Sequence, residues 1–480
     1  MPDELIAPSA LSGQRPLVID LDGTLLRSDL LFETLFASFA AGWPSGLLSA
    51  ASRGRAALKA FFASRSTLDY ATLPYDEEVL AHARRAKAEG RPVYLATASN
   101  GAHAEAIAAH LGLFDGVFAS DAEFNLKGAH KAARLVEAFG ARGFDYIGDS
   151  GADLPVWAQA GRAYHVRAGA STRARLAGLA PEAEAIETPP VPLRKWLEAV
   201  RVHQYAKNLL LFVPMFTAHK FTLATFGPVL AGVIAFSLCA SSVYLLNDLV
   251  DLQADRAHLT KRNRPLASGA IPIAAATVLA PVLLLAAGLV AAFVSPLFLA
   301  CLAGYFAMTT AYTFSLKSKM IADVVTLALL YTVRVLAGGI AADVIVSQWL
   351  LAFSIFIFMS LALMKRYVEL ANIAERSLPD PRNRNYKVSD LPIIAALAAA
   401  SGMNSVTIFA LYISSSMAET AYSRPWALWL ACPVLLYWLA RALMMAHRRL
   451  MDDDPVVFAL RDRVSRRAFV CIVALVLIAI

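Results

Sequence analysis

The chain has 480 residues, of which 58% are hydrophobic and 17% are charged, and its mean hydropathy is +0.54. This composition excludes an ordinary soluble globular protein and predicts several membrane spans. The long apolar runs begin near residue 208, whereas residues 1–200 have a normal globular composition. The net charge of +7 follows from basic loops in the apolar part, so we expect no nucleic-acid partner.

The N-terminus, MPDELIAPSALSG, lacks a basic start followed by an apolar core. No cleavable signal peptide is therefore expected, and the first domain should stay in the cytoplasm. The four cysteines lie in apolar segments without metal-ligand spacing, which indicates small buried hydrophobic residues.

Three short apolar segments of the first domain end in polar side chains. Residues 15–22 contain the run PLVIDLD, residues 92–99 read PVYLATAS, and residues 144–153 read FDYIGDSGAD. Helix-like stretches lie between them. Alternating strands and helices predict a mostly parallel α/β sheet with ligands at the carboxyl ends of its strands.

Four motifs in this region resemble, in order, those of the haloacid dehalogenase superfamily. They are DLDGT (20–24), Thr97 in ATASN, Lys127 in NLKG, and GDSGAD (148–153). The resemblance implies an α/β Rossmann-like phosphatase over residues 1–186, with a small helical cap between the first two motifs. A degenerate domain that serves only for docking or regulation is the alternative.

The same resemblance implies a role for each motif. Asp20 would attack phosphorus, and Asp22 would be the general acid and then the base. Thr97 and Lys127 would hold the phosphoryl oxygens. One Mg²⁺ would be bound by three carboxylates, with a fourth in support: Asp20, Asp22 and Asp149, supported by Asp153. A carboxylate nucleophile splits hydrolysis into two steps, and its charge must be screened from the phosphate by cations.

Two segments lie between the recognisable parts of the chain. The apolar stretch 42–54 falls where the cap is expected. The stretch 170–195 indicates a linker, with ETPPVP at 187–192, and residues 193–208 predict one helix along the membrane interface. We assign residues 187–207 to this linker and interfacial helix.

Residues 208–480 predict an all-α, multi-pass membrane bundle of about nine helices. The expected spans are 208–222, 224–246, 272–293, 295–313, 321–341, 347–365, 391–415, 425–446 and 467–480. The loops on one side (247–271, 314–320, 366–390 and 446–466) carry sixteen Lys and Arg, against only Lys220 and Arg424 opposite. This asymmetry predicts that these loops and the first domain face the cytoplasm, at what we expect is a bacterial inner membrane.

The first of these loops has four polar side chains that fall within about 100° of one helix face: Asn247, Asp248, Asp251 and Asp255. Three carboxylates on one stripe repel each other unless a cation lies among them, and Mg²⁺ prefers such oxygen ligands. Four cationic or titratable side chains follow that suit phosphate oxygens: His258, Lys261, Arg262 and Arg264. The pattern predicts a diphosphate site; a solvated, acidic helix end is the alternative.

Three segments of this region resemble the UbiA superfamily of intramembrane prenyltransferases. They are YAKNLLLF (205–212), which contains Lys207 and Asn208, NDLVDLQAD (247–255), and AYTFSLKSKMIADVV (311–325). The resemblance implies a nine-helix bundle with a lipid-accessible cavity and one or two Mg²⁺ ions at a bound diphosphate. The third segment departs from the family pattern, because its second acidic motif offers only Tyr312, Lys317 and Asp323.

The extension HLTKRNRP (258–265) resembles the branch that makes polyprenyl-phosphoryl-5-phosphoribose. In that branch phosphoribosyl pyrophosphate is the donor and a polyprenyl phosphate is the acceptor. Six cations could hold the donor's phosphates: Lys261, Arg262, Arg264, Lys317, Lys365 and Arg366. The first domain would then remove the 5-phosphate. The alternatives are a prenyltransferase acting on an aromatic or other small acceptor, and a non-catalytic membrane scaffold or transporter.

Charged residues inside the predicted spans also suggest function, because an ionisable group in a membrane is costly. Asp323 and Arg334 are eleven residues apart, which places them on one helix face. They predict a substrate-binding face; a structural Asp–Arg bridge between helices is the alternative. Lys365 and Glu369 could form an ordinary helix pair, although Arg366 beside them favours anion binding. The sequence leaves a homo-oligomer open.

Overall fold

The computed structural model describes residues 14–40, 68–120, 125–258, 260–376, 385–451 and 455–480, with isolated positions between 49 and 66. The chain forms two compact units. The first comprises residues 1–200 and 244–280, and the second comprises residues 201–243 and 281–480. This division differs from the predicted domains, because the segment with the predicted diphosphate site packs with the N-terminal domain.

The first unit contains a six-stranded, fully parallel sheet with the strand order β3-β2-β1-β4-β5-β6. The strands are β1 (Leu17–Asp20), β2 (Val93–Asn100), β3 (Gly116–Ser120), β4 (Asp145–Gly148), β5 (Ala163–Val166) and β6 (Glu184–Ile186). The strands predicted from residues 15–22, 92–99 and 144–153 are confirmed as β1, β2 and β4. The order reverses at β1, and ligands of such sheets bind at the carboxyl ends next to the reversal.

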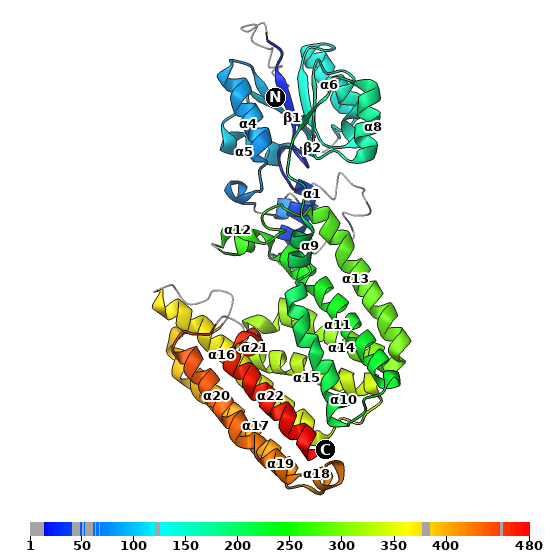
Figure 1. Ribbon diagram of the computed structural model, residues 1–480. Helices are drawn as coiled ribbons and strands as arrows, with labels where there is room; N and C mark the ends of the chain where they lie inside the picture. Colours follow the sequence, from blue (N-terminus) through cyan, green and yellow to red (C-terminus); the bar gives the residue numbers. More distant parts are fainter. Residues whose placement is uncertain are drawn as a thin grey trace. The chain divides into compact units, whose positions relative to one another are not determined.

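Side chains that alternate along β1 enter two different cores. Leu17 and Ile19 pack with one set of helices, whereas Val18 packs with another. Helices α1 (Leu30–Ala40), α4 (Glu77–Ala88) and α5 (Gly101–Leu111) belong to the first set, and α6 (Ala129–Phe139), α7 (Leu154–Trp157) and α8 (Ala170–Leu179) to the second. Figure 1 shows α4 and α5 on one face of the sheet and α6 and α8 on the other. The polar ends of the strands lie between these two layers.

Two predictions about connecting segments are wrong. The stretch 170–186 is not linker, because α8 packs against the core there and β6 completes the sheet. Residues 193–208 do not form one helix: α9 (Leu193–Ala199) ends before Arg201, whose φ of 54° is left-handed, and a 3₁₀ helix η3 (Val202–Phe212) follows. The predicted cap segment 42–54 lies almost wholly outside the described residues.

The remaining segment of the first unit, residues 244–280, holds the predicted diphosphate loop. It contains the end of α11 (Leu223–Val250), α12 (Leu252–Ala257), the short η4 (Lys261–Asn263) and the start of α13 (Ile273–Val294). Short 3₁₀ turns η1 (Tyr70–Thr72) and η2 (Gly151–Asp153) lie elsewhere in this unit.

The second unit is all-helical. It contains α10 (Val213–Thr217), α14 (Pro296–Phe314), η5 (Leu316–Ser318), α15 (Ala322–Ala342), α16 (Gln348–Glu375), η6 (Val388–Asp390), α17 (Leu391–Ile413), α18 (Ser416–Ala421), α19 (Trp426–Trp429), α20 (Ala431–His447), α21 (Pro455–Arg461) and α22 (Arg463–Ala479), with parts of α11 and α13. One apolar core joins α15, α16, α17 and α20, and another joins η3, α11, α14 and α15. Figure 1 shows α16, α17, α20 and α22 running side by side.

Seven helices in the described part of the chain are long and apolar enough to cross a membrane. They confirm seven of the nine predicted spans and make this a multi-pass membrane protein. The other two spans differ. Residues 208–222 are divided between η3 and the five-residue α10, and α22 has only 17 residues.

Asp76 gives the first unit a testable buried charge. It is fully buried, caps α4 by accepting from the backbone N–H groups of Glu78 and Val79, and pairs with Arg27 and Arg167. Burial alone would raise the pKa of its carboxyl, but the two guanidinium groups hold that pKa below its usual value.

We predict that Asp76→Ala destabilises the first unit by about 3 kcal/mol or more at pH 7, because it removes a helix cap and leaves two cations without their buried partner. The parent gains this stability while Asp76 is ionised and loses it as the pH falls through the lowered pKa, so the difference should shrink in strong acid. Hydrogen exchange of α4 in the detergent-solubilised protein measures it, with Glu77→Ala on the exposed face as control. Equal exchange in both variants at neutral pH would contradict the prediction.

Candidate functional sites

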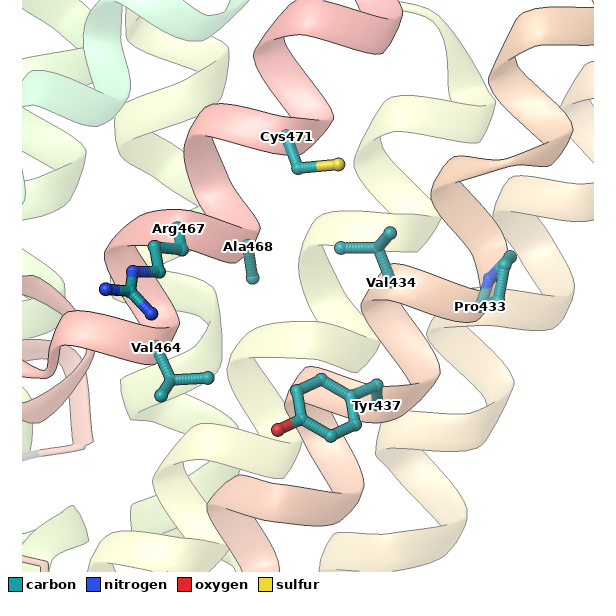
Figure 2. Close-up of a pocket in the computed structure, with 7 residues that line it drawn as sticks. All are labelled: Pro433, Val434, Tyr437, Val464, Arg467, Ala468 and Cys471. Atoms are coloured by element: carbon teal, nitrogen blue, oxygen red, sulfur yellow. The ribbon is translucent and has the colours of Figure 1, made fainter.

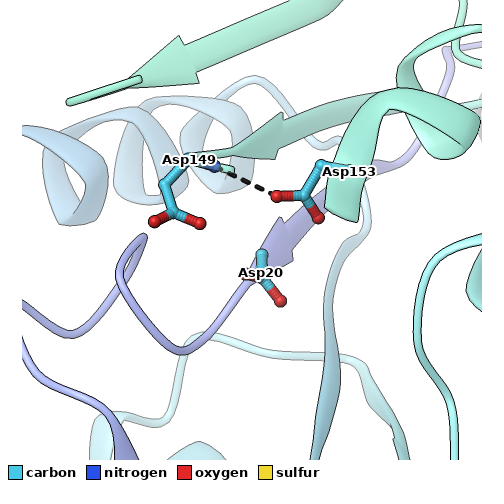
Figure 3. A group of neighbouring side chains, drawn as sticks. All are labelled: Asp20, Asp149 and Asp153. Carbon is cyan, nitrogen blue, oxygen red and sulfur yellow. Dashed lines mark hydrogen bonds between the residues drawn. The ribbon is translucent and has the colours of Figure 1, made fainter. Parts of the chain in front are cut away.

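Three carboxylates meet at the carboxyl ends of β1 and β4. One oxygen from each of Asp20, Asp149 and Asp153 lies within 4.8 Å of the others. Figure 3 shows Asp20 at the end of its strand facing the loop that carries the other two. That loop is held by Asp153, whose Oδ2 accepts from the backbone N–H groups of Asp149 at 3.2 Å and Ser150 at 3.1 Å. The arrangement brings together groups that are about 130 residues apart in the chain.

Asp22 has a different environment from the one predicted. Its Oδ2 accepts from the hydroxyls of Ser99 at 2.5 Å and Thr97 at 3.3 Å, and its Oδ1 accepts from the backbone N–H of Leu30 at 2.8 Å. Its carboxylate is not part of the described metal-ligating group, in which Asp153 takes its place. A carboxylate held by hydroxyls beside Asp20 suits a proton carrier better than a metal ligand.

The lysine beside Asp20 is Lys131 and not Lys127. Nζ of Lys131 lies 2.6 Å from Oδ1 of Asp20 and 3.0 Å from the hydroxyl of Tyr146, and the side chain is buried. Lys127 is exposed. The reason is the position of α6, which begins at Ala129 and brings its third residue to face β1, whereas Lys127 precedes the helix. The signal that could have found Lys131 is its place on an apolar helix face.

The electrostatics of this cluster favour a bound cation. Burial raises the pKa of Asp20, and the nearby Asp153 and Asp149 carboxylates raise it further against the attraction of Lys131. Burial and Asp153 raise the pKa of Asp149 to about 7. The pKa of Asp149 stays raised despite the attraction of Arg167 and Lys131, so the donor set fits a divalent metal such as Mg²⁺.

Gly23 allows this close approach. Its φ is +78°, and a Cβ atom at this position would lie 2.3 Å from Oδ2 of Asp149. A side chain there would therefore clash with the carboxylate, so the glycine of DLDGT is required by both conformation and space.

The predicted diphosphate loop forms the second site. The helix does not continue unbroken through it, because α11 ends at Val250 and α12 starts at Leu252. Helical spacing is nevertheless kept. The backbone N–H of Asp251 donates to the carbonyl of Asn247, and the backbone N–H of Asp255 donates to the carbonyl of Asp251, each at 2.8 Å. The predicted common face is thus preserved across the break.

Arg264 lies between two of these aspartates. Its Nη1 donates to Asp248 at 3.1 Å and to Asp255 at 2.6 Å, and both carboxylates are buried. Asn247 and Asp251 are half-buried. Arg264, which was predicted to bind phosphate, is therefore paired with these two carboxylates. The carboxylates fit Mg²⁺ by their chemistry, and a metal between them would have to displace this guanidinium.

The other predicted cations of the loop, His258, Lys261 and Arg262, are exposed. The Nδ1 of His258 accepts a hydrogen bond from the backbone N–H of Thr260 at 3.3 Å. Lys261 and Arg262 belong to η4, one turn before Arg264. They remain candidates for phosphate binding.

In the second unit, Arg334 does not share a site with Asp323. Its Nε donates to Oδ1 of Asn208 at 2.9 Å and its Nη2 to the hydroxyl of Tyr305 at 2.8 Å. Eleven residues of helix separate it from Asp323 by about 16 Å, so a shared face does not bring the two together. Arg334 instead fastens η3 to α14 and α15. These contacts hold the bundle together, and its predicted substrate role stays a prediction.

Asp323 pairs with Arg366 across α15 and α16. Nη2 of Arg366 lies 2.5 Å from Oδ2 of Asp323, and both side chains are almost completely buried. The hydroxyl of Tyr386 donates to Oδ1 of Asp323 at 2.5 Å, and Arg366 also pairs with Glu369. The alternative of an Asp–Arg bridge between helices therefore applies, but its arginine is Arg366.

Four other predicted residues of this unit, Lys207, Tyr312, Lys317 and Lys365, are half-buried. The ammonium of Lys207 lies 5.7 Å from the centre of the Tyr331 ring, a cation–π contact. Glu369 pairs with Arg366. None of these observations tests substrate binding, so their roles stay predictions.

Two surface cavities lie apart from these residues. One of about 390 Å³ lies between α20 and α22, where Figure 2 shows Tyr437, Arg467 and Cys471 around it. Another of about 670 Å³ in the first unit is lined by His165, Arg167 and Arg173. Neither contains a residue predicted from the sequence.

Comparison with known families identifies both parts of the chain. Residues 209–476 match the model of the UbiA prenyltransferase family, and residues 17–158 match that of haloacid dehalogenase-like hydrolases. The chain belongs to the UbiA prenyltransferase family. It carries a haloacid dehalogenase-like hydrolase domain in its N-terminal part.

Three relatives define its similarity further. An uncharacterized protein of Sinorhizobium fredii is 38% identical over 94% of this chain and 88% of its own length. A nodulation protein of Azorhizobium caulinodans is 33% identical over 60% of this chain and 92% of its own length. A decaprenyl-phosphate phosphoribosyltransferase of Mycolicibacterium smegmatis is 38% identical over 41% of this chain and 63% of its own length.

The hydrolase-like site yields a direct comparison of two lysines. We predict that Lys131→Met lowers the turnover of a soluble phosphomonoester such as p-nitrophenyl phosphate by about 10²-fold or more, because the transferring phosphoryl group loses a preorganised ammonium. Lys127→Met, its matched control, should retain turnover within about twofold, because surface changes away from a site have small effects. Steady-state kinetics with both purified proteins measure this. Loss of turnover in Lys127→Met alone would restore the prediction made from the sequence.

Proposed function

We propose that this protein is a bifunctional, Mg²⁺-dependent membrane enzyme. Its UbiA-type part would transfer 5-phosphoribose from phosphoribosyl pyrophosphate to a polyprenyl phosphate. Its hydrolase domain would then remove the 5-phosphate and release polyprenyl-phosphoryl-ribose. The observation that carries the proposal is the fusion of a phosphatase-type aspartate cluster to a chain whose relatives include decaprenyl-phosphate phosphoribosyltransferases.

The transfer step breaks the bond between the anomeric carbon and the diphosphate and forms a bond from that carbon to an oxygen of the lipid phosphate. Positive charge develops on the sugar and negative charge on the leaving diphosphate. Asp248, Asp251 and Asp255 would hold Mg²⁺, which supplies charge neutralisation to the diphosphate when it is bound. Arg264, released from the carboxylates, would contact the phosphate oxygens, with Lys261 and Arg262 beside it.

The hydrolysis step begins with attack of a carboxylate oxygen of Asp20 on the 5-phosphate. The bond from phosphorus to the sugar oxygen breaks, and Asp22 gives that oxygen a proton. Asp22 then takes a proton from the water that cleaves the acyl phosphate, which regenerates Asp20 and releases inorganic phosphate. Lys131 holds the phosphoryl oxygens, with Thr97 near Asp22. Asp20 and Asp149 would hold a Mg²⁺ that screens the nucleophile from the phosphate.

The two sites would act on one face of the membrane. The basic loops lie on the predicted cytoplasmic side, which is also where the donor would be supplied. Linking two active sites raises the effective concentration of the first product at the second site. Removing the 5-phosphate would also make the first step harder to reverse.

We predict that Asp20→Asn stops the reaction at the phosphorylated lipid, because the amide cannot attack phosphorus. Purified protein supplied with phosphoribosyl pyrophosphate, Mg²⁺ and a polyprenyl phosphate should yield the dephosphorylated lipid, and mass spectrometry should find the variant's product one phosphate heavier. Glu137→Gln, an equally isosteric change on the exposed face of α6, serves as control. Identical lipids from parent and Asp20→Asn would refute the coupling of the two steps.

We also predict that Asp255→Asn lowers formation of either lipid by about 10²-fold or more, because the leaving diphosphate loses part of its metal site. Removal of Mg²⁺ with a chelator should have the same effect on the parent. The exposed Glu375→Gln should not. A prenyl diphosphate offered with aromatic acceptors tests the other UbiA chemistry: product from that pair, and none from the ribosyl donor, would replace the proposed donor.

A further inference from the structure

Helix α1 contacts the hydrolase-like site at its first residue and contacts α12 one turn later. Its first backbone N–H, that of Leu30, donates to Oδ1 of Asp22 at 2.8 Å, so the start of the helix is fixed to the proposed proton carrier. Glu33, one turn later, is 1% exposed and faces α12. Both helices lie close together in the first unit (Figure 1).

Glu33 forms a bidentate ion pair with Arg256. Nη1 of Arg256 lies 2.8 Å from Oε2, and Nη2 lies 2.7 Å from Oε1. Gln253 donates to the same carboxylate at 3.3 Å, and the hydroxyl of Ser28 donates to it as well. A buried carboxylate that receives this many donors is held in one orientation.

Arg256 links Glu33 to the predicted diphosphate loop, here called the aspartate loop. Its Nε donates to the carbonyl of Ala267 at 3.0 Å, so one buried guanidinium joins α12 to the far end of the loop. Asp255, its neighbour in the chain, accepts from Arg264. The loop between residues 255 and 267 is therefore closed by two arginines, of which one is anchored on the hydrolase domain.

The end of the loop also packs against the hydrolase domain. Gly269 has a φ of +68°, and a Cβ atom there would lie 2.7 Å from Cβ of Pro74 and 3.0 Å from Cβ of Arg27. Such contact leaves no room for a side chain, so the backbone of the loop is held at this end too.

The buried Glu33–Arg256 ion pair is not explained by stability alone. An apolar pair of similar volume often stabilises a protein as well as a buried ion pair does, whereas an ion pair fixes one geometry. We propose that Glu33 and Arg256 are positioning residues, through which α1 of the hydrolase domain holds Asp255 and Arg264 in place for the diphosphate donor. The proposal rests on the proposed function for its kinetic consequence, but its structural part does not.

The test uses the full-length protein with Glu33→Gln, Arg256→Gln and both changes together. Hydrogen exchange in residues 251–258 and 260–269 should rise in all three variants, and the KM for the ribosyl donor should rise about tenfold, the size of a coupling of 1.4 kcal/mol. Because the residues act as one pair, the donor KM of the double variant should equal that of either single variant. Glu77→Gln on α4 is the control.

A second pair of changes separates positioning from stability. Glu33→Met combined with Arg256→Met should restore thermal stability toward that of the parent, because no charge stays buried, while the donor KM stays raised. Recovery of both together would show a purely structural role and overturn the proposal. So would unchanged exchange in residues 251–269 for Glu33→Gln. If the parent makes no ribosyl lipid, the proposed function fails, and the exchange measurement still decides whether Glu33 holds the loop.

Discussion

The fold takes carboxylates out of water and places them close to one another, and both candidate sites depend on how that charge is compensated. At the ends of β1 and β4, three aspartates lie close together, and Lys131 pairs with two of them, Asp20 and Asp153. Asp248 near the end of α11 and Asp255 in α12 both pair with Arg264. Burial makes an unpaired charge expensive, so each cluster is neutralised in part by protein and is suited to a cation for the remainder.

This compensation differs between the sites in a way that matters for chemistry. Lys131 is buried and fixed by Asp20 and Tyr146, so it belongs permanently to its cluster. Arg264 is about a third exposed and lies in a loop. In the proposed reaction it would exchange a carboxylate for a phosphate oxygen when the donor and metal bind. The first cluster would then act in a fixed arrangement, whereas the second would change its ion-pair partners.

Two further buried ion pairs link separate elements of the structure. Asp323 with Arg366 joins two membrane helices, and Glu33 with Arg256 joins the hydrolase domain to the aspartate loop. The grouping of residues 244–280 with the N-terminal domain follows the same contacts. The loop that should bind the donor is therefore supported by the domain that should process the product.

Local pattern was sufficient to predict the α/β and membrane parts, three of the six strands and seven apolar spans. It also brought Asp20 and Asp149 to the same place, because strand ends in a parallel sheet converge at one edge. Lys131 was missed because its proximity to Asp20 depends on where α6 starts, which the nearby NLKG motif does not reveal. The partners of buried charges were missed for a related reason.

Arg366 and Arg334 illustrate why the partners of buried charges were missed. A shared helix face correctly aligned Asp323 with Arg334, but distance along the helix separates them, and the true partner lies on another helix. Glu33 and Arg256 carried no local signal at all, since their pairing is made only when two distant segments pack. Periodicity gives the direction of a side chain and not the partner that it meets.

The proposed function requires that one protein pass a phosphorylated lipid from the first reaction to the second. A donor labelled with ¹⁴C in the ribose and ³²P in the 5-phosphate follows both steps in a single incubation with polyprenyl phosphate and Mg²⁺. We predict that the carbon label enters the lipid fraction while the phosphorus label is released as inorganic phosphate. Carbon and phosphorus that remain together in the lipid, or a lipid fraction without carbon label, would contradict it.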